Sequence, residues 1–263
     1  MKDMHEKRRR PAQTAPVEEI EGQLEGRNAL TEALKSGRTI DKVFIAAGDT
    51  DRALQRLAAQ AKEAGAVVVP VDRRKLDAMS TTHSHQGVIT LAAAHEYSTI
   101  DDILQEAADR GENALIVICD ELTDPHNLGA ILRSAECAGA HGVIIPKRRS
   151  VGLTAVVAKA SAGAVEYMKV ARGTNINNAI AELKEKGVWI FGTAAEGSIP
   201  MYQADLTGPA AIVIGNEGQG MSPLVRKNCD VTVNIPMKGR ISSLNASAAA
   251  SILLYEAVRQ RLG

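Results

Sequence analysis

The sequence predicts an α/β protein in two units, a small one followed by a larger one built on a buried parallel sheet. Helical patterns alternate with short apolar runs from about residue 25 to the end of the chain, as a sheet with crossover helices requires. In the second half these runs are continuous, as expected of strands buried on both faces. The 263 residues, 45% of them hydrophobic, suffice for one large core or two modest ones.

Bulk composition excludes several classes of protein. The formal net charge is zero, so affinity for nucleic acid must come from a local patch. No apolar run approaches the roughly 18 residues of a membrane helix, and the start MKDMHEKRRR lacks the apolar region of a secretory signal. Cys119, Cys137 and Cys229 are widely spaced, which favours reduced thiols over a disulfide or a zinc site. We therefore expect a cytoplasmic protein without a metal.

The first unit is expected over residues 25–95, after a tail. Residues 1–24 mix basic and acidic side chains with little periodicity, which is typical of a tail without fixed structure. The pattern then predicts helices over 27–37, 49–65 and 73–80 and strands over 41–46, 66–71 and 87–93. His83 and His85 precede the last strand. With no third ligand beside them, they are predicted to be polar loop residues.

A helical linker over 96–112 leads to the second unit, residues 113–263. The expected elements are strands near 114–119, 142–146, 189–193, 211–215 and 231–236 and helices near 127–140, 175–186 and 245–261. Ligands of open α/β sheets bind at the carboxyl ends of the strands. Three such ends carry more polar chemistry than a turn requires.

The first polar loop, residues 120–140, contains Asn127 and Arg133. Asn127 stands where a helix N-cap is wanted, so capping and a functional role are both open. Two interpretations of Arg133 are also open, a surface charge and a functional residue.

The second polar loop reads AIVIGNEGQGMS, residues 211–222. Its glycines, Gly215, Gly218 and Gly220, match neither the dinucleotide fingerprint nor the P-loop, and Glu217 would repel a phosphate. The glycines therefore let the backbone approach a neutral or cationic ligand, or they form a bare tight turn.

The third polar loop lies in IPMKGRISSLNASAAASILLYE, residues 235–256. Ser242, Ser243 and Asn245 exceed what one helix cap needs. The Ala and Ser residues that follow permit close approach of another backbone, either at a subunit interface or at a tight internal crossing. The chain has no G-x-S-x-G elbow and no HExxH motif, so serine-hydrolase and zinc-protease chemistries are disfavoured.

Taken together, these segments resemble the three signature motifs of the SpoU (TrmH-type) family of RNA 2′-O-ribose methyltransferases. The matching text is DPHNLGAILRSAECAGAHGVII, IVIGNEGQGMS and IPMKGRISSLNASAAASILLYEAVRQR. The stretches EGRNALTEALKSGRTIDKVFIA and HQGVITLAAAHEYSTIDDIL look like the ribosomal-protein-L30-like substrate-binding domain and linker of its 23S rRNA guanosine branch.

The resemblance implies a fold, a cofactor and partners. The second unit should carry a deep trefoil knot, one of the rare exceptions to unknotted chains. The cofactor should be S-adenosylmethionine, contacted by Gly215, Ile235 and Leu244, with Thr193 as a further candidate. The chain should form a homodimer through the knotted domain and act on RNA.

The resemblance also supplies candidate functional residues: Asn127, Arg133, Glu217, Ser243 and Asn245. A guanidinium hardly ever loses its proton, so our hypothesis is that Arg133 grips the target phosphate rather than acting as the base. Ser243 and Asn245 would position the ribose, and Glu217 would hold Arg133 or Asn127.

The substrate that the resemblance favours is a guanosine of 23S rRNA. The alternatives are a tRNA 2′-O-ribose methyltransferase of the same fold and a non-catalytic RNA-binding or ribosome-assembly factor. A dinucleotide-dependent oxidoreductase is disfavoured by the glycine spacing. A local excess of basic residues fits either a phosphate track or a solvated face; it comprises Lys147, Arg148, Arg149, Lys159, Lys169 and Arg172.

Overall fold

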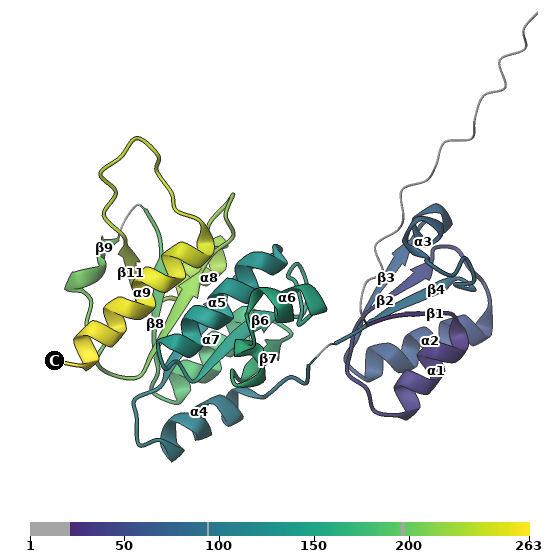
Figure 1. Ribbon diagram of the computed structural model, residues 1–263, viewed down its shortest axis with the longest axis horizontal. Coiled ribbons are helices and arrows are strands. Elements are labelled where there is room, and N and C mark those ends of the chain that lie inside the picture. The colour runs from purple at the N-terminus through teal and green to yellow at the C-terminus, as the bar shows by residue number, and fades with distance from the viewer. Residues whose placement is uncertain (1–21, 94, 196–197) are drawn as a thin grey trace, which may run out of the picture.

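A computed structural model describes residues 22–93, 95–195 and 198–263. The chain forms two lobes, each with its own sheet, joined by one connection (Figure 1). The predicted tail lies outside the described residues up to residue 21. Its last residues belong to the first strand, β1 (Gln23–Glu25), so the predicted boundary at residue 24 falls inside an element.

The first lobe is a four-stranded sheet in the order β1-β4-β2-β3. Strand β4 is antiparallel to β1 and β2, whereas β2 and β3 are parallel. Helices α1 and α2 bury Leu30 and Leu54 against one face, and α3 buries Leu76 against the other. After β1, the elements are α1 (Arg27–Lys35), β2 (Ile40–Ala46), α2 (Arg52–Glu63), β3 (Val67–Val71), α3 (Arg73–Met79) and β4 (Val88–Ala92).

The second lobe is a seven-stranded sheet in the order β7-β6-β5-β10-β8-β11-β9, with parallel pairing throughout. Its elements up to β8 are α4 (Ile100–Asp109), β5 (Leu115–Cys119), α5 (Pro125–Cys137), β6 (Gly142–Pro146), α6 (Ala155–Ala160), β7 (Val170–Gly173), α7 (Ile176–Glu185) and β8 (Trp189–Thr193). The remaining elements are β9 (Ile199–Pro200), β10 (Ala210–Ile214), α8 (Pro223–Asn228), β11 (Val231–Asn234) and α9 (Ala246–Arg261).

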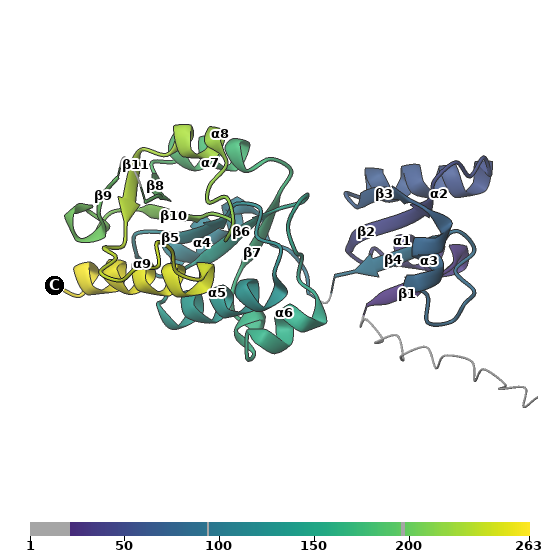
Figure 2. The ribbon, with the colours of Figure 1, turned by 90° about the horizontal axis from the view of Figure 1, so that it is seen from above.

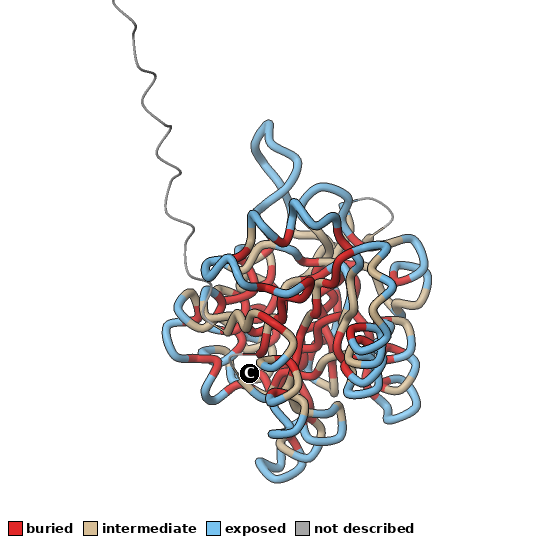
Figure 3. The backbone as a smooth tube through the Cα atoms, turned by 90° about the vertical axis from the view of Figure 1, so that its right-hand side faces the viewer, coloured by how far each residue is buried: buried red, intermediate tan, exposed pale blue. Residues whose placement is uncertain are grey.

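Helices cover both faces of the large sheet. Helices α5, α6 and α9 contribute to one hydrophobic cluster, and α4, α7 and α8 contribute to another. Figure 2 shows α5, α6 and α9 on one side of the sheet and α7 and α8 on the other. Every residue of β5, β6 and β10 is buried, and the buried backbone gathers in the centre of the molecule in Figure 3. This confirms that the continuous apolar runs are strands of a parallel sheet buried on both faces.

The small residues of α9 serve an internal helix crossing. Ala246, Ala250 and Ala257 are buried in the cluster that α9 shares with α5. Ser134 of α5 and Ser251 of α9 lie 2.7 Å apart, hydroxyl to hydroxyl. Of the two uses predicted for the Ala and Ser run, close internal packing is therefore present.

Strand β11 lies between β8 and β9, although β8 and β9 follow each other along the chain. The sheet therefore separates two strands that are neighbours in the chain, and the segment that leaves β11 leads to α9 (Figure 1). The trefoil knot itself stays a prediction.

The start of α5 differs from the expected one. Asp124, not Asn127, is the N-cap, and its carboxylate accepts a hydrogen bond of 2.8 Å from the backbone N–H of His126. Pro125 occupies the first helical position, where its missing N–H has no cost. The capping interpretation of Asn127 is therefore wrong, and the Asn127 side chain is available for other contacts.

A buried polar junction joins the two lobes. The Arg172 guanidinium of β7 pairs with the Asp41 carboxylate of β2, and both side chains are about 95% buried. The Tyr97 hydroxyl donates to Asp41 over 2.9 Å and accepts from the backbone N–H of Leu153 over 2.9 Å. Arg172 also lies 5.1 Å from the Tyr97 ring centroid. The first lobe is thus held to the second by a buried ion pair and the hydrogen bonds of Tyr97.

Candidate functional site

The three polar loops meet at the carboxyl edge of the large sheet. The segments that follow β8, β10 and β11 surround a cavity of about 740 Å³, within the usual range for small-molecule sites. All four residues that the sequence predicts to contact the cofactor line this cavity: Thr193, Gly215, Ile235 and Leu244. The ribbon shows the segment between β11 and α9 projecting above the sheet beside this edge (Figure 1).

The glycine-rich loop after β10 is closed on itself. Asn216 and Gly220 exchange two backbone hydrogen bonds of 3.1 and 2.8 Å. A Cβ atom added to Gly215 would stand 2.3 Å from the backbone of Gly220 and Met221. The glycine at 215 is therefore required by the loop's own backbone, while the same residue also forms part of the cavity wall.

Side chains that the sequence analysis did not single out anchor this loop. The Asp120 carboxylate accepts from the backbone N–H of Ser222 over 2.7 Å, and the Asn216 amide donates to the carbonyl of Glu121 over 3.1 Å. Glu121 has a positive φ of 57°. The available signal was an acidic pair directly after a buried strand at the binding edge.

The cavity combines apolar walls with polar edges. Ile214, Val233 and Leu253 line it from the sheet and α9. Leu244 is 38% exposed and Met237 39% exposed, so apolar side chains face the open cavity. Such a lining suits a ligand that combines a flat apolar part with polar groups.

A chain of hydrogen bonds links three of the predicted functional residues. The Asn245 amide donates to the Asn127 side-chain oxygen over 2.9 Å. The Asn127 amide in turn donates to the Glu217 carboxylate. These residues come from α9, α5 and the glycine-rich loop, so the fold unites side chains that lie far apart in sequence.

Asn245 does two things at once. Its side-chain oxygen caps α9 by accepting from the backbone N–H of Ser247 over 2.9 Å, while its amide orients Asn127. Asn127 is 7% exposed and Glu217 is exposed, so the chain runs from the interior to the cavity rim. Each amide is fixed because its oxygen and its nitrogen have different partners.

The other two predicted functional residues lie apart from this chain. Ser243 lines the cavity, but its hydroxyl bonds to none of the described residues. Arg133 is exposed on α5 and outside the cavity lining, and no described side chain pairs with it. The structure therefore unites three of the five residues, places Ser243 at the cavity, and leaves Arg133 on the surface.

The predicted basic track is smaller than the sequence suggests. Arg172 is buried at the junction between the lobes, Lys169 pairs with Glu106, and Arg149 pairs with Glu121. The remaining basic side chains pair with no carboxylate in the described parts of the chain: Lys147, Arg148 and Lys159.

Cysteine and metal chemistry find no support at this site. All three cysteines are unpaired thiols, and burial raises the pKa of Cys119 to about 12. Within residues 22–93, 95–195 and 198–263, no three His, Cys, Asp or Glu side chains are placed to hold a metal ion.

In that same part of the chain, no helix is long and apolar enough to cross a membrane.

Comparisons with known proteins match both lobes. The model of the SpoU rRNA Methylase family matches residues 114–255. A second model, described as RNA 2′-O ribose methyltransferase substrate binding, matches residues 23–98.

Similar proteins span nearly the whole chain. The chain is 46% identical over 236 residues to YacO of Bacillus subtilis, named as a TrmH family tRNA/rRNA methyltransferase; the match covers 90% of this chain and 94% of YacO. Among solved structures, it resembles the SpoU methyltransferase AviRb from Streptomyces viridochromogenes in complex with AdoMet, at TM-score 0.59 and 26% identity over 91% and 90% of the two chains. An AdoMet-bound rRNA methyltransferase from Sinorhizobium meliloti matches at TM-score 0.59 and 27% identity over 92% and 88%.

Proposed function

Because the chain belongs to the SpoU rRNA methylase family, we propose that it methylates the ribose 2′-oxygen of a guanosine in 23S rRNA. The chain is an RNA methyltransferase that uses S-adenosylmethionine. The observation that carries ribose methylation is the Asn245–Asn127–Glu217 chain, which reaches the cavity through Glu217. The choice of rRNA is supported by the description of the matching family model.

The cavity fits the cofactor. When bound, S-adenosylmethionine supplies a methyl group on a positively charged sulfur. Gly215, Ile235 and Leu244 would hold it, since their backbone and apolar side chains line a cavity of suitable size. The exposed Glu217 at the rim favours a cationic ligand over a phosphate.

The residues around the cavity would position the ribose. As the 2′-oxygen bonds to the methyl carbon, the carbon–sulfur bond breaks and the hydroxyl proton leaves. The Ser243 hydroxyl lies at the cavity and bonds to no residue that the structure describes, and Asn127 is held in one orientation by its two partners. Holding the ribose 2′-oxygen in line with the methyl group would lower the activation barrier through proximity and orientation.

Arg133 would grip the target phosphate and stay protonated. Its guanidinium is exposed and unpaired among the described residues, which leaves its planar donors available for a bidentate contact. The 2′-hydroxyl proton would then pass to phosphate or water.

The substrate and assembly proposals rest on surface features. Phosphate contacts are offered by three basic residues that pair with no carboxylate among the described residues: Lys147, Arg148 and Lys159. The homodimer through the second lobe is proposed from the family resemblance, with the 51% exposed Tyr255 of α9 as a candidate contact. The reduced thiols are consistent with a cytoplasmic location.

The test is methyl transfer from methyl-labelled S-adenosylmethionine to unmodified 23S rRNA and, separately, to a pool of unmodified tRNA. We expect label on one guanosine of 23S rRNA and none on tRNA. Label on tRNA alone would keep the chemistry and overturn the substrate, in line with the tRNA/rRNA wording of the relatives' names.

A further inference from the structure

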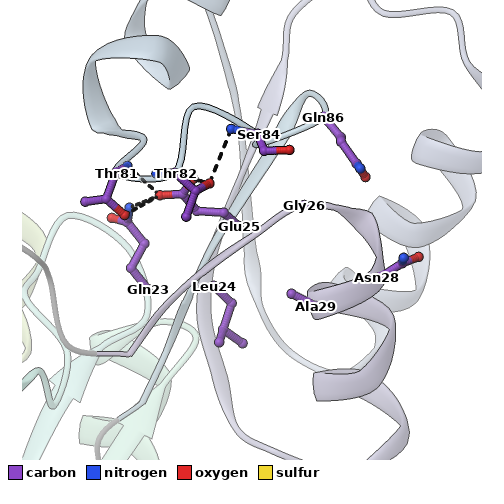
Figure 4. Close-up of a pocket in the computed structure, with 10 residues that line it drawn as sticks. All are labelled: Gln23, Leu24, Glu25, Gly26, Asn28, Ala29, Thr81, Thr82, Ser84 and Gln86. Atoms are coloured by element: carbon purple, nitrogen blue, oxygen red, sulfur yellow. Dashed lines mark hydrogen bonds between the residues drawn. The ribbon is translucent and has the colours of Figure 1, made fainter.

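The first lobe carries a second cavity, far in sequence from the methyl-transfer site. It measures about 520 Å³ and lies between the β1–α1 junction and the loop from Ser80 to Gly87 (Figure 4). We propose that this cavity receives an unpaired nucleobase of the RNA substrate. The inference rests on the proposed function and names where the first lobe contacts that RNA.

The loop that forms one wall is held rigidly by Glu25. Its carboxylate accepts from three hydroxyls, two backbone N–H groups and one amide, supplied by Gln23, Ser80, Thr81 and Thr82. Burial raises the pKa of Glu25, but these hydrogen bonds outweigh it and hold the pKa well below its ordinary value. A carboxylate has about four lone-pair sites, so none of its hydrogen-bonding capacity is left for a ligand.

The rest of the loop is also fixed before any ligand binds. His85 is buried, its Nε2 lies 2.9 Å from the Asp77 carboxylate, and its Nδ1 accepts from the backbone N–H of Gly87. His83 and Gln86 have positive φ values of 55° and 50°, a conformation that costs free energy. A loop held in strained conformations by so many contacts is preorganised for binding.

The hydrogen-bonding groups left over in the cavity are uncharged. Asn28 is exposed at the start of α1, and its side-chain amide bonds to no described residue. The Gln86 side-chain oxygen accepts from the backbone N–H of Arg27 over 3.3 Å, and its amide nitrogen donates to no group in the described parts of the chain. Figure 4 shows the Asn28 and Gln86 amides on one side of the Gly26 turn and the Glu25 cluster on the other.

One acceptor in the wall lacks a donor. The Gln23 amide nitrogen donates to Glu25 and to the carbonyl of Met79, which fixes the amide orientation. Its oxygen is buried and has no partner among the described residues. Because buried polar atoms are almost always paired, this oxygen indicates that a donor is expected nearby.

This set of groups matches a nucleobase better than a phosphate. Amide side chains pair with the donor and acceptor pattern of base edges, and Leu24 and Ala29 offer apolar surface for the base face. The cavity's one carboxylate opposes a phosphate inside it. Unpaired bases of RNA loops are the usual targets of sequence-specific recognition.

A neighbouring arginine suits the adjoining backbone phosphate. A smaller cavity on the other side of Gln86 is lined by Arg27, Arg73 and Asp49. Arg27 is paired with Asp51, whereas Arg73 is exposed and pairs with no carboxylate that the structure describes. Arg73 is therefore the cation available to the phosphate beside the bound base.

The experiment compares full-length Asn28→Ala with Asn178→Ala, a matched control. Asn178 is also an exposed asparagine in the first turn of a helix, in the other lobe and away from both cavities. We expect Asn28→Ala to raise the Kd for 23S rRNA about tenfold, while Asn178→Ala and S-adenosylhomocysteine binding stay unchanged. Arg73→Ala should weaken RNA binding and reduce the slope of log K against log salt concentration by about one. Arg74→Ala, the control at the neighbouring arginine, should leave both the affinity and the slope unchanged.

Photocrosslinking of 23S rRNA transcripts that contain thiolated bases gives an independent readout. Crosslinked peptides should come from residues 22–35 or 80–87. If wild type methylates RNA while Asn28→Ala binds it equally well and crosslinks elsewhere, the nucleobase site is wrong and the proposed function stands. If wild type neither binds nor methylates 23S rRNA or tRNA, the proposed function fails and the nucleobase site fails with it.

Discussion

At the scale of single residues, the central feature is an amide held between two partners. Asn127 accepts from Asn245 and donates to Glu217, so its orientation depends on residues from three separate segments. The family resemblance in the sequence predicted these residue identities but not their mutual contacts. It predicted that Glu217 would hold Arg133 or Asn127, and the contact present is the one with Asn127.

We predict that Asn127→Asp lowers the rate of methyl transfer by roughly 100-fold, because two facing carboxylates would repel and misplace the ribose-binding groups. Binding of S-adenosylhomocysteine, measured by calorimetry, should change little, since Asn127 does not line the cavity. A variant with normal turnover would show that the hydrogen-bonded chain is dispensable.

A second residue-scale prediction concerns His141, which is buried next to β5. Its Nδ1 accepts from the backbone N–H of Leu115 over 3.0 Å, and its Nε2 lies 3.0 Å from Glu112. Burial lowers the pKa of His141 below its ordinary value of 6.5, although Glu112 opposes the shift. The folded state therefore favours neutral His141.

The stabilisation from neutral His141 is complete above pH 6.5 and is lost as the pH falls through the lowered pKa. Urea unfolding of wild type should show a smaller free energy of unfolding at about pH 5.5 than at about pH 7.5. His141→Asn should reduce this difference, while the same change at the exposed His126 should preserve it. Equal pH dependence in wild type and His141→Asn would contradict this assignment.

At the scale of elements, the site depends on how loops are closed rather than on their composition. Glycines 215, 218 and 220 look alike in the sequence, yet only Gly215 stands against backbone atoms at 2.3 Å. Gly218 has only the Asn216 side-chain oxygen nearby, at 3.5 Å. Sequence spacing excluded the common nucleotide motifs, but it carried no information on which glycine is sterically required.

We therefore predict that Gly215→Ala weakens binding of S-adenosylhomocysteine by at least about tenfold, because backbone at 2.3 Å must shift to admit the methyl group. Gly218→Ala should bind nearly as wild type. Calorimetric titration of both variants checks this, and similar affinities for the two would show that the loop is soft.

Strands with a continuous apolar run and helices with several turns could be predicted, whereas elements without either pattern could not. The buried strands β5, β6 and β10 and the helices α7 and α9 match their predicted ranges closely. Strands β7 and β9 were missed because their four and two residues include no continuous apolar run, and the six-residue helices α6 and α8 were missed because they do not complete two helical turns. The start of α5 was misplaced by the Asp124-Pro125 pair, which breaks the strand and also begins the helix.

At the scale of the whole molecule, the two lobes are joined by a buried charge pair. Nothing local in the sequence indicates that Arg172, within a basic stretch, pairs with Asp41 some 130 residues earlier. The strand order and the insertion of β11 between β8 and β9 are equally non-local. These features depend on contacts between segments that lie far apart in the sequence. Local residue patterns therefore do not predict them.

We predict that Arg172→Ala loosens the junction between the lobes by about 3–5 kcal/mol, because it leaves the buried Asp41 without its partner. Small-angle scattering should then show a larger radius of gyration with unchanged secondary structure. Arg148→Ala, an exposed neighbour, is the control. Unchanged scattering for Arg172→Ala would mean that other contacts hold the lobes.

The measurement that tests the central claim most directly is alkaline hydrolysis of RNA labelled by the enzyme with a radioactive methyl group. A 2′-O-methyl group removes the hydroxyl that alkali needs to cleave the adjacent phosphodiester. We expect the label in alkali-resistant dinucleotides, and its loss in the Asn127→Asp variant. Label released in mononucleotides would place the methyl group on a base and contradict ribose methylation by this site.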